Sequence, residues 1–245
     1  MNMPLRSTIT RSPQQALITH RDPMAAASEA FRVLRTNLQF MGLDKPLKSV
    51  LITSATPGEG KSTVAANLAV AFAQNGANVC LIDADLRRPT LHKIFGMDSY
   101  PGLTTALLGG GGGSENAIMK TDVPGLKLIT SGPIPPNPAE LLGSAKMEKF
   151  LRELEERFDM VIVDTPPVLA VTDAAVLAPK VGGVVVVTRA GNVARQQVVR
   201  AKQALEAVKA NVLGAVLDGV EAEGREGYYY YYYYSSGDGD RTNKR

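Results

Sequence analysis

The sequence predicts an α/β domain, with a doubly wound, mostly parallel sheet and helices on both of its faces. Short apolar runs rich in Val and Ile alternate with segments of helical periodicity, which is typical of parallel sheets. The chain has 245 residues, of which 44% are hydrophobic and 21% are charged, so one buried core can form. One cysteine and two histidines exclude a disulfide framework and disfavour a metal site built from histidines.

The expected elements follow one another along the chain. The first is a helix from Met24 to Phe40, where apolar residues recur at spacings of three and four. The expected strands are 49–53, 79–82, 126–129, 160–163, 183–187 and 212–217. The expected helices are 62–74, 145–158, 173–177 and 194–208, and a short helix starts at Ala139 after a proline-rich connection.

Both ends of the chain lack this pattern. Residues 1–22 carry Arg6, Arg11 and Arg21 without an acidic residue up to position 21, so the net charge of +3 arises in a basic flexible arm. Residues 221–245 contain no Val, Ile, Leu, Met or Phe, and we expect a flexible tail. The nucleotide-binding domain then spans 23–220, with the glycine run 109–113 as a loop tip.

Membrane insertion and secretion have no signal in this sequence. No run of 18 apolar residues occurs, and the first ten residues lack the apolar core of a signal peptide. We therefore expect a cytoplasmic protein.

A phosphate-binding loop is predicted at 55–63, directly after a strand and at the start of a helix. Gly58 and Gly60 would let backbone N–H groups turn toward phosphate oxygens, and Lys61 would bind the β and γ phosphates. Ala55 departs from the motif, which has glycine at that position. The expected nucleotide-binding residues are Thr56, Pro57, Gly58, Glu59, Gly60, Lys61, Ser62 and Thr63, with the Ser62 hydroxyl as a Mg²⁺ ligand.

Carboxylates close two of the predicted strands. Asp83 and Asp85 follow the strand 79–82, and Asp164 follows the strand 160–163. Because the carboxyl ends of parallel strands line the ligand crevice, these side chains should lie near the phosphate loop. Asp164 fits the acidic residue that holds Mg²⁺. Each carboxylate could instead cap the helix that follows it.

The nucleotide and the role of the nearby arginines are less strongly specified. ATP is favoured over GTP, because the guanine-reading pattern Asn-Lys-x-Asp is missing and the only Asn-Lys is Asn243-Lys244. Arg87 and Arg88 could contact phosphates, although a solvated or ion-paired position is favoured. The weak net charge disfavours nucleic acid as a partner.

Seven of the eight tyrosines are contiguous: Tyr228, Tyr229, Tyr230, Tyr231, Tyr232, Tyr233 and Tyr234. They could form a β-strand, stack on nucleic-acid bases or accept phosphate. Base stacking is disfavoured because no Lys or Arg interrupts the run. Phosphate acceptance is favoured by the nucleotide site in the same chain, and a tether that extends about 3.3 Å per residue could enter a neighbouring subunit's site.

Together these motifs resemble the bacterial tyrosine kinases of capsular and exopolysaccharide synthesis, of the separate-chain type. The resemblance covers about residues 20–235 and rests on segments 57–62, 81–89, 135–142 and 163–167 and on the tyrosine cluster. It implies a protein-tyrosine autokinase that uses ATP and Mg²⁺ and phosphorylates its tyrosine cluster in trans. The alternative is a switch ATPase of the partitioning type, which would carry a second lysine where this chain has Thr56.

The resemblance also implies roles for particular residues. Lys61, Asp83 and Asp85 would be catalytic, with Asp83 accepting the tyrosine proton, and Ser62, Asp83, Asp85 and Asp164 would bind the metal. Glu29, Arg32 and Arg35 would join subunits into a ring, whereas their spacing alone predicts only a charged stripe on one helix face.

The partners that the resemblance implies lie at the membrane. They are a transmembrane polysaccharide co-polymerase, which supplies an activating segment at the inner face of the cell membrane, and a phosphotyrosine phosphatase.

Overall fold

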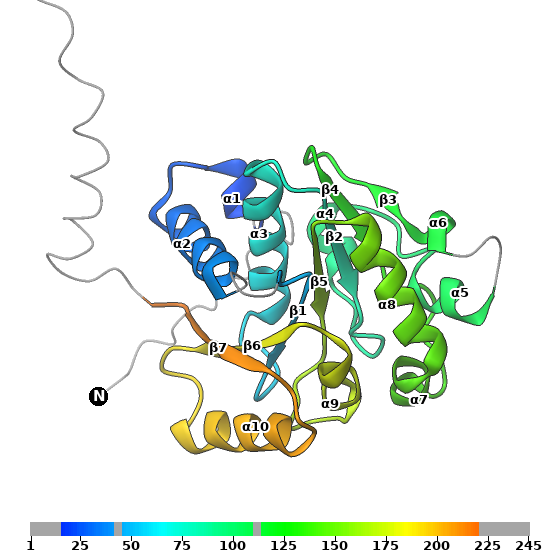
Figure 1. Cartoon of the computed structure of the whole chain (residues 1–245). Coiled ribbons are helices and arrows are strands. Elements are labelled where there is room, and N and C mark those ends of the chain that lie inside the picture. Colours follow the sequence, from blue (N-terminus) through cyan, green and yellow to red (C-terminus); the bar gives the residue numbers. More distant parts are fainter. Residues whose placement is uncertain (1–15, 42–45, 110–113, 221–245) are drawn as a thin grey trace, which may run out of the picture.

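The computed structural model describes residues 16–41, 46–109 and 114–220. These residues form a seven-stranded sheet with the strand order β3-β4-β2-β5-β1-β6-β7 (Figure 1). The strands are β1 (Ser49–Ser54), β2 (Val79–Asp83), β3 (Met119–Lys120), β4 (Leu126–Ile129), β5 (Met160–Asp164), β6 (Gly183–Arg189) and β7 (Val212–Asp218). All pairings are parallel except that of β3 with β4, so the predicted fold class is confirmed.

Helices cover both faces of this sheet (Figure 1). They are α1 (Ile18–Arg21), α2 (Ala26–Met41), α3 (Lys61–Gln74), α4 (Leu91–Phe95), α5 (Leu103–Leu108), α6 (Ser114–Ala117), α7 (Pro138–Gly143), α8 (Ala145–Arg157), α9 (Asp173–Leu177) and α10 (Arg195–Ala207), with a 3₁₀ helix at Ala178–Lys180. Each expected helix and strand is present with ends shifted by at most two residues. Strand β3, the short helices α1, α4, α5 and α6 and the 3₁₀ helix are not predicted from the sequence.

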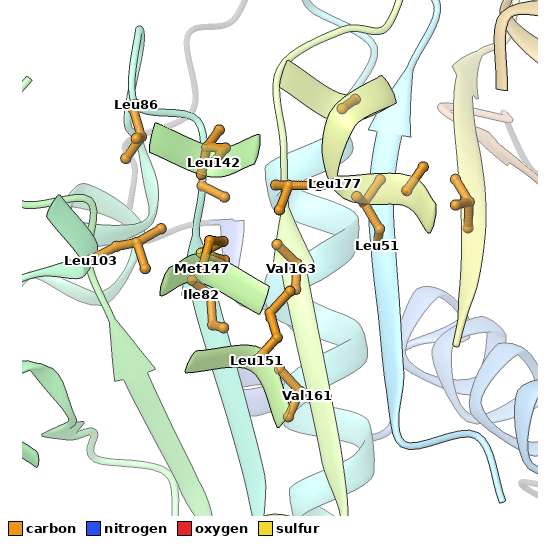
Figure 2. Packing of buried hydrophobic residues seen from close by; sticks show 14 of the residues in the cluster. Leu51, Ile82, Leu86, Leu103, Leu142, Met147, Leu151, Val161, Val163 and Leu177 are labelled. Carbon is orange, nitrogen blue, oxygen red and sulfur yellow. The ribbon is translucent and has the colours of Figure 1, made fainter. Parts of the chain in front are cut away.

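The core explains why the strands are continuously apolar. In β5, Val161 and Val163 pack in a cluster with α8, whereas the intervening Ile162 packs in a cluster with α3. Figure 2 shows the first of these clusters, in which residues of α8 such as Leu151 lie against the strands. Because successive side chains point to opposite faces and both faces are covered, the residues of β5 before Asp164 are all apolar, whereas β7 at the edge of the sheet is partly exposed.

The packed region begins earlier than the sequence indicates. Asn67 of α3 accepts a hydrogen bond from the N–H of Thr19 (2.9 Å) and donates one to the carbonyl of Ala16 (2.6 Å). Gln74 donates to the carbonyl of Thr19 at 3.0 Å. The predicted boundary at residue 22 is therefore wrong, because polar side chains of α3 hold this segment and hydrophobic periodicity cannot reveal such contacts.

Several predictions fall on residues that the structure does not describe. These are the first part of the predicted arm, the glycine run apart from Gly109, and the whole tail with its tyrosine cluster. Within the described ranges, no helix combines the length and the apolar composition needed to cross a bilayer.

Candidate active site

The phosphate loop connects β1 to α3, as the sequence predicts. Gly58 and Gly60 have φ angles of +84° and +89°, in the left-handed region that favours glycine. At Gly60 a β-carbon would also collide with the carboxylate of Asp218, the last residue of β7. Lys61 begins α3, so the first-turn N–H groups of this helix, which lack acceptors inside the helix, lie at the loop.

The side chain of Glu59 folds back into this loop. It is buried, and its Oε1 accepts hydrogen bonds from the backbone N–H of Thr56 and from the Thr56 hydroxyl, the latter at 2.8 Å. Its Oε2 is buried without a hydrogen-bond partner among the described residues. These two side chains brace the loop from within, and their predicted role in nucleotide binding stays a prediction.

Lys61 lies among carboxylates. Its Nζ is 2.9 Å from Oδ2 of Asp85, 3.9 Å from Oδ1 of Asp164 and 3.2 Å from the Ser62 hydroxyl. Burial lowers the pKa of Lys61, but the charges of Asp164 and Asp85 outweigh this effect and the pKa is raised overall. Lys61 is therefore a fixed cation at the start of α3, where phosphate groups would be neutralised.

Asp83 and Asp85 occupy different layers of the site. The Oδ2 of Asp83 accepts hydrogen bonds from the N–H groups of Thr90 (3.1 Å) and Leu91 (3.0 Å), and Oδ1 accepts one from Asp85 (3.3 Å). Asp83 thus caps the start of α4. The pKa of Asp83 is raised, mainly by burial and also by the charge of Asp164. Asp85 lines the cavity described below, whereas Asp83 is wholly buried.

Asp164 and Ser62 offer the oxygen atoms that Mg²⁺ requires. The Asp164 carboxylate is fully buried, and neither oxygen makes a hydrogen bond of normal geometry within the described residues. Burial raises its pKa, and the charge of Lys61 and the nearby Ser62 hydroxyl oppose this effect.

No three His, Cys, Asp or Glu side chains of the described residues form a metal cage. Mg²⁺ commonly takes one or two carboxylates together with substrate phosphates and water, so a buried aspartate without a hydrogen bond of normal geometry, beside a hydroxyl, fits this ion.

A cavity of about 560 Å³ opens beside these groups. Its polar wall comes from the phosphate loop, the start of α3 and the segment after β2: Gly58, Gly60, Lys61, Ser62, Thr63 and Asp85. Its apolar wall comes from α4 and the segment after β5: Ile94, Pro166, Pro167, Ala170 and Val171. One cavity therefore offers both a phosphate-binding surface and a surface suited to an apolar or aromatic group.

An ion pair that the sequence does not reveal connects Arg87, which lines the cavity, to α9. Arg87 donates to both oxygens of Asp173, from Nε and Nη2, at 2.9 Å each. Asp173 is the first residue of α9 and is fully buried. The ion-paired position favoured for Arg87 is thus confirmed, but its partner lies 86 residues away and no local pattern indicates it.

The residues predicted to join subunits are engaged within this chain. Glu29 and Arg32 form an ion pair of 2.7 Å on the surface of α2, with both side chains 31% exposed. Arg35 donates to the carbonyl of Ala71 in α3 at 3.2 Å. Their role in a ring stays a prediction.

Comparison with known proteins shows the family to which the chain is similar. A family profile described as ParA, "NUBPL iron-transfer P-loop NTPase", matches residues 46–244. The chain is 46% identical over 229 residues to "Tyrosine-protein kinase YwqD" of Bacillus subtilis (strain 168), covering 93% of this chain and 96% of that protein. Among solved structures, "The kinase domain of Escherichia coli tyrosine kinase ETK" has a TM-score of 0.82 and 37% identity, covering 90% of this chain and 86% of that one.

A more distant likeness concerns the fold alone. The septum site-determining protein MinD from Pyrococcus horikoshii has a TM-score of 0.60 and 24% identity, covering 69% of this chain and 69% of that one. The fold and the phosphate loop define a P-loop NTPase of the ParA type. Within that class, the chain belongs to the family of bacterial tyrosine kinases.

Proposed function

We propose that this enzyme transfers the γ-phosphoryl group of ATP to tyrosines of the C-terminal cluster of an adjacent subunit, and thereby regulates capsular or exopolysaccharide synthesis or export. The observation that carries the proposal is the arrangement of Lys61 with Asp85 and Asp164 beside a cavity that also has an apolar wall. The last strand supports it, because Asp218 contacts the phosphate loop and the chain then continues toward Tyr228.

Phosphoryl transfer requires little covalent chemistry from the protein and much positioning. The bond from the γ phosphorus to its bridging oxygen breaks, a bond to the tyrosine oxygen forms, and the phenolic proton passes to a carboxylate. Lys61 would bind the transferred phosphate, and the loop N–H groups would orient the remaining phosphates. Ser62 and Asp164 would hold Mg²⁺, which supplies neutralisation of phosphate charge when it is bound.

The proton acceptor is Asp83, at the end of β2, or Asp85, just after it. The resemblance assigns this role to Asp83, and a pKa raised toward neutrality suits a general base. Asp85, however, is the carboxylate that reaches the cavity, and it also holds Lys61. Comparing Asp83→Asn with Asp85→Asn in single-turnover transfer would show which carboxylate the tyrosine needs.

The activity is tested with purified protein, ATP and Mg²⁺, and phosphorylated residues are mapped by mass spectrometry. We expect phosphotyrosine only within the cluster 228–234, and none in Lys61→Met or in a chain whose seven tyrosines are replaced by Phe. Lys149→Met, at an exposed lysine of α8, is the matched control and should retain transfer. Steady ATP hydrolysis without phosphotyrosine would show instead that the chain is a switch ATPase.

Transfer in trans needs subunits held side by side. We propose that Glu29, Arg32 and Arg35 join copies of α2 into a ring. The ion pair between Glu29 and Arg32 within one helix would be replaced by ion pairs between neighbouring subunits. Arg32→Ala combined with Arg35→Ala should lower the mass measured by light scattering, and mixing Lys61→Met with the seven-Phe chain should restore phosphotyrosine on the former. An unchanged mass would remove the ring from the proposal.

The remaining proposals concern the cell. We propose a cytoplasmic kinase recruited to the inner face of the membrane by a transmembrane co-polymerase that activates it, with a phosphotyrosine phosphatase reversing the modification. The family resemblance supports these partners. Co-purification from membranes, with and without detergent, tests the recruitment, and a chain recovered only in the soluble fraction would contradict it.

A further inference from the structure

Four charged side chains line the cavity, and only three of them are paired. Lys61 forms an ion pair with Asp85 at 2.9 Å, and Arg87 donates two hydrogen bonds to the carboxylate of Asp173. The side chain of Arg88 is exposed and makes no hydrogen bond or ion pair to any described residue. Among the residues that line the cavity, Arg88 is therefore the charged side chain without a partner among the described residues.

The backbone below this charge is firmly held. The N–H of Arg88 donates to Oδ1 of Asp85 at 2.9 Å, and the other oxygen of that carboxylate binds Lys61. Pro89 follows and restricts the backbone of Arg88 to extended conformations. Asp83 then anchors the N–H groups of Thr90 and the next residue. The backbone that carries the guanidinium is thus fixed in place, and the side chain is ordered when the guanidinium binds an anion.

The apolar wall belongs to the same cavity as Arg88. Ile94, Pro166 and Pro167 are buried, whereas Val171 is half-buried and Ala170 is exposed. Proline and aliphatic surfaces of this kind accept the face of an aromatic ring, which gains mainly from removing apolar area from water. A phenol ring on this wall, with its hydroxyl toward Lys61, would leave the flanking residues of its peptide near the mouth of the cavity.

Resting on the kinase function proposed above, we propose that Arg88 is a specificity-determining residue, which selects acceptor tyrosines that have an acidic residue close by in the chain. The tail has this composition, with Glu221, Glu223 and Glu226 before the cluster and Asp238 and Asp240 after it. An exposed arginine recognises carboxylates and phosphates through the same forked donors.

This preference would explain why the tyrosines are contiguous. A phosphotyrosine carries a charge of about −1.5 to −2, so each modified residue becomes an acidic neighbour for the next one. Glu226 is separated from Tyr228 by one residue, whereas Asp238 is separated from Tyr234 by three. Phosphorylation should therefore begin at the Tyr228 end of the cluster and proceed toward Tyr234.

The test uses the full chain with ATP, Mg²⁺ and two synthetic acceptor peptides. One peptide copies residues 221–231, and the other has its three glutamates replaced by lysine. The wild type should have a KM about fivefold lower for the acidic peptide, the size expected of one solvent-exposed ion pair. Arg88→Glu should reverse this preference, while Arg88→Lys should keep its direction.

The matched control is Lys93→Glu, which makes the same charge reversal at an exposed residue of α4 that does not line the cavity. It should keep the preference of the wild type. Thermal melting of each variant verifies that it is folded.

Two results would overturn the inference. Equal KM values for both peptides in the wild type and in Arg88→Glu would show that Arg88 does not read the acceptor. A KM for ATP raised in Arg88→Glu with either peptide, without a change in preference, would show that Arg88 binds the nucleotide. Absence of phosphotyrosine on any substrate of the wild type would remove the kinase function itself, and this inference with it.

Discussion

The free energy of unfolding should fall more when Arg87 is removed from its ion pair with Asp173 than when Asp173 is changed. The Arg87 side chain is 39% exposed and could bind water if Asp173 were changed, whereas the Asp173 side chain is 0% exposed and could not if Arg87 were removed. Removing one partner of a buried pair costs about 3–5 kcal/mol when the other charge stays buried. Loss of a hydrogen bond to a charged group that can rehydrate costs about 1.5 kcal/mol.

We therefore expect Arg87→Ala to lower the free energy of unfolding by about 3 kcal/mol and Asp173→Asn by about 1.5 kcal/mol. For a domain of this size the first value corresponds to a fall in Tm of about 6–12 °C. The assay is urea unfolding and thermal melting without nucleotide, at neutral pH. The double variant Arg87→Ala/Asp173→Asn should be at least as stable as Arg87→Ala, because the buried charge has been removed.

The opposite ranking would refute this reasoning. If Asp173→Asn cost more than Arg87→Ala, the buried carboxylate would be stabilised by groups other than Arg87. Additive losses in the double variant would show that the two side chains are not coupled.

Three further predictions concern the loop, the metal site and the N-terminal segment. Burial raises the pKa of Asp164, so its charge destabilises the fold increasingly as pH rises from the ordinary value of 3.8 through the raised pKa. Although Asp164→Asn removes one neighbour of Lys61, this variant should have a higher Tm than the wild type in EDTA at neutral pH. The difference in Tm should disappear in acid, where Asp164 of the wild type is protonated. Asn67→Ala should remove about 2 kcal/mol of local stability and speed amide exchange in α1, whereas unchanged exchange would mean that its hydrogen bonds are dispensable. Gly60→Ala should abolish nucleotide binding in calorimetry, while Gly76→Ala, with a similar φ of +87° but open space around it, should cost only about 1 kcal/mol of stability; equal effects on binding would contradict the collision argument.

Most of the sheet was predictable because central strands such as β1, β2 and β5 are buried on both faces, whereas β7 at the edge is partly exposed. A run such as 160–163 has no polar position, and its length suits a strand, so the pattern and the burial indicate the same element. The helices α4 and α6 have five and four residues, too few to display a helical period, and β3 has two. The place of α4 depends on the turn after β2, in which Asp83 accepts hydrogen bonds from Thr90 and Leu91, and hydrophobic periodicity does not reveal such a turn.

The residues of the candidate site were predictable, but not which of them line the cavity and which are buried behind it. Strand ends and the phosphate motif correctly place Lys61, Asp85 and Asp164 together. Asp83 and Asp85 have the same residue type and similar positions in the motif, and only the turn after β2 decides that one lines the cavity. Pairings between distant segments, such as that of Arg87, leave no trace in local spacing.

The contact of Asp218 with Gly60 has a consequence for local concentration. It fixes the point where the last strand leaves the domain at the edge of the phosphate loop, and residues 219–227 separate this point from the first tyrosine of the cluster. At about 3.3 Å per residue, the ten steps from Asp218 keep Tyr228 within about 33 Å of the phosphate loop of its own subunit. Short tethers give effective concentrations on the order of millimolar. For a kinase that modifies its own tail, the supply of acceptor is therefore set by tether geometry, and dilution of the protein in the cell changes it only by separating the subunits.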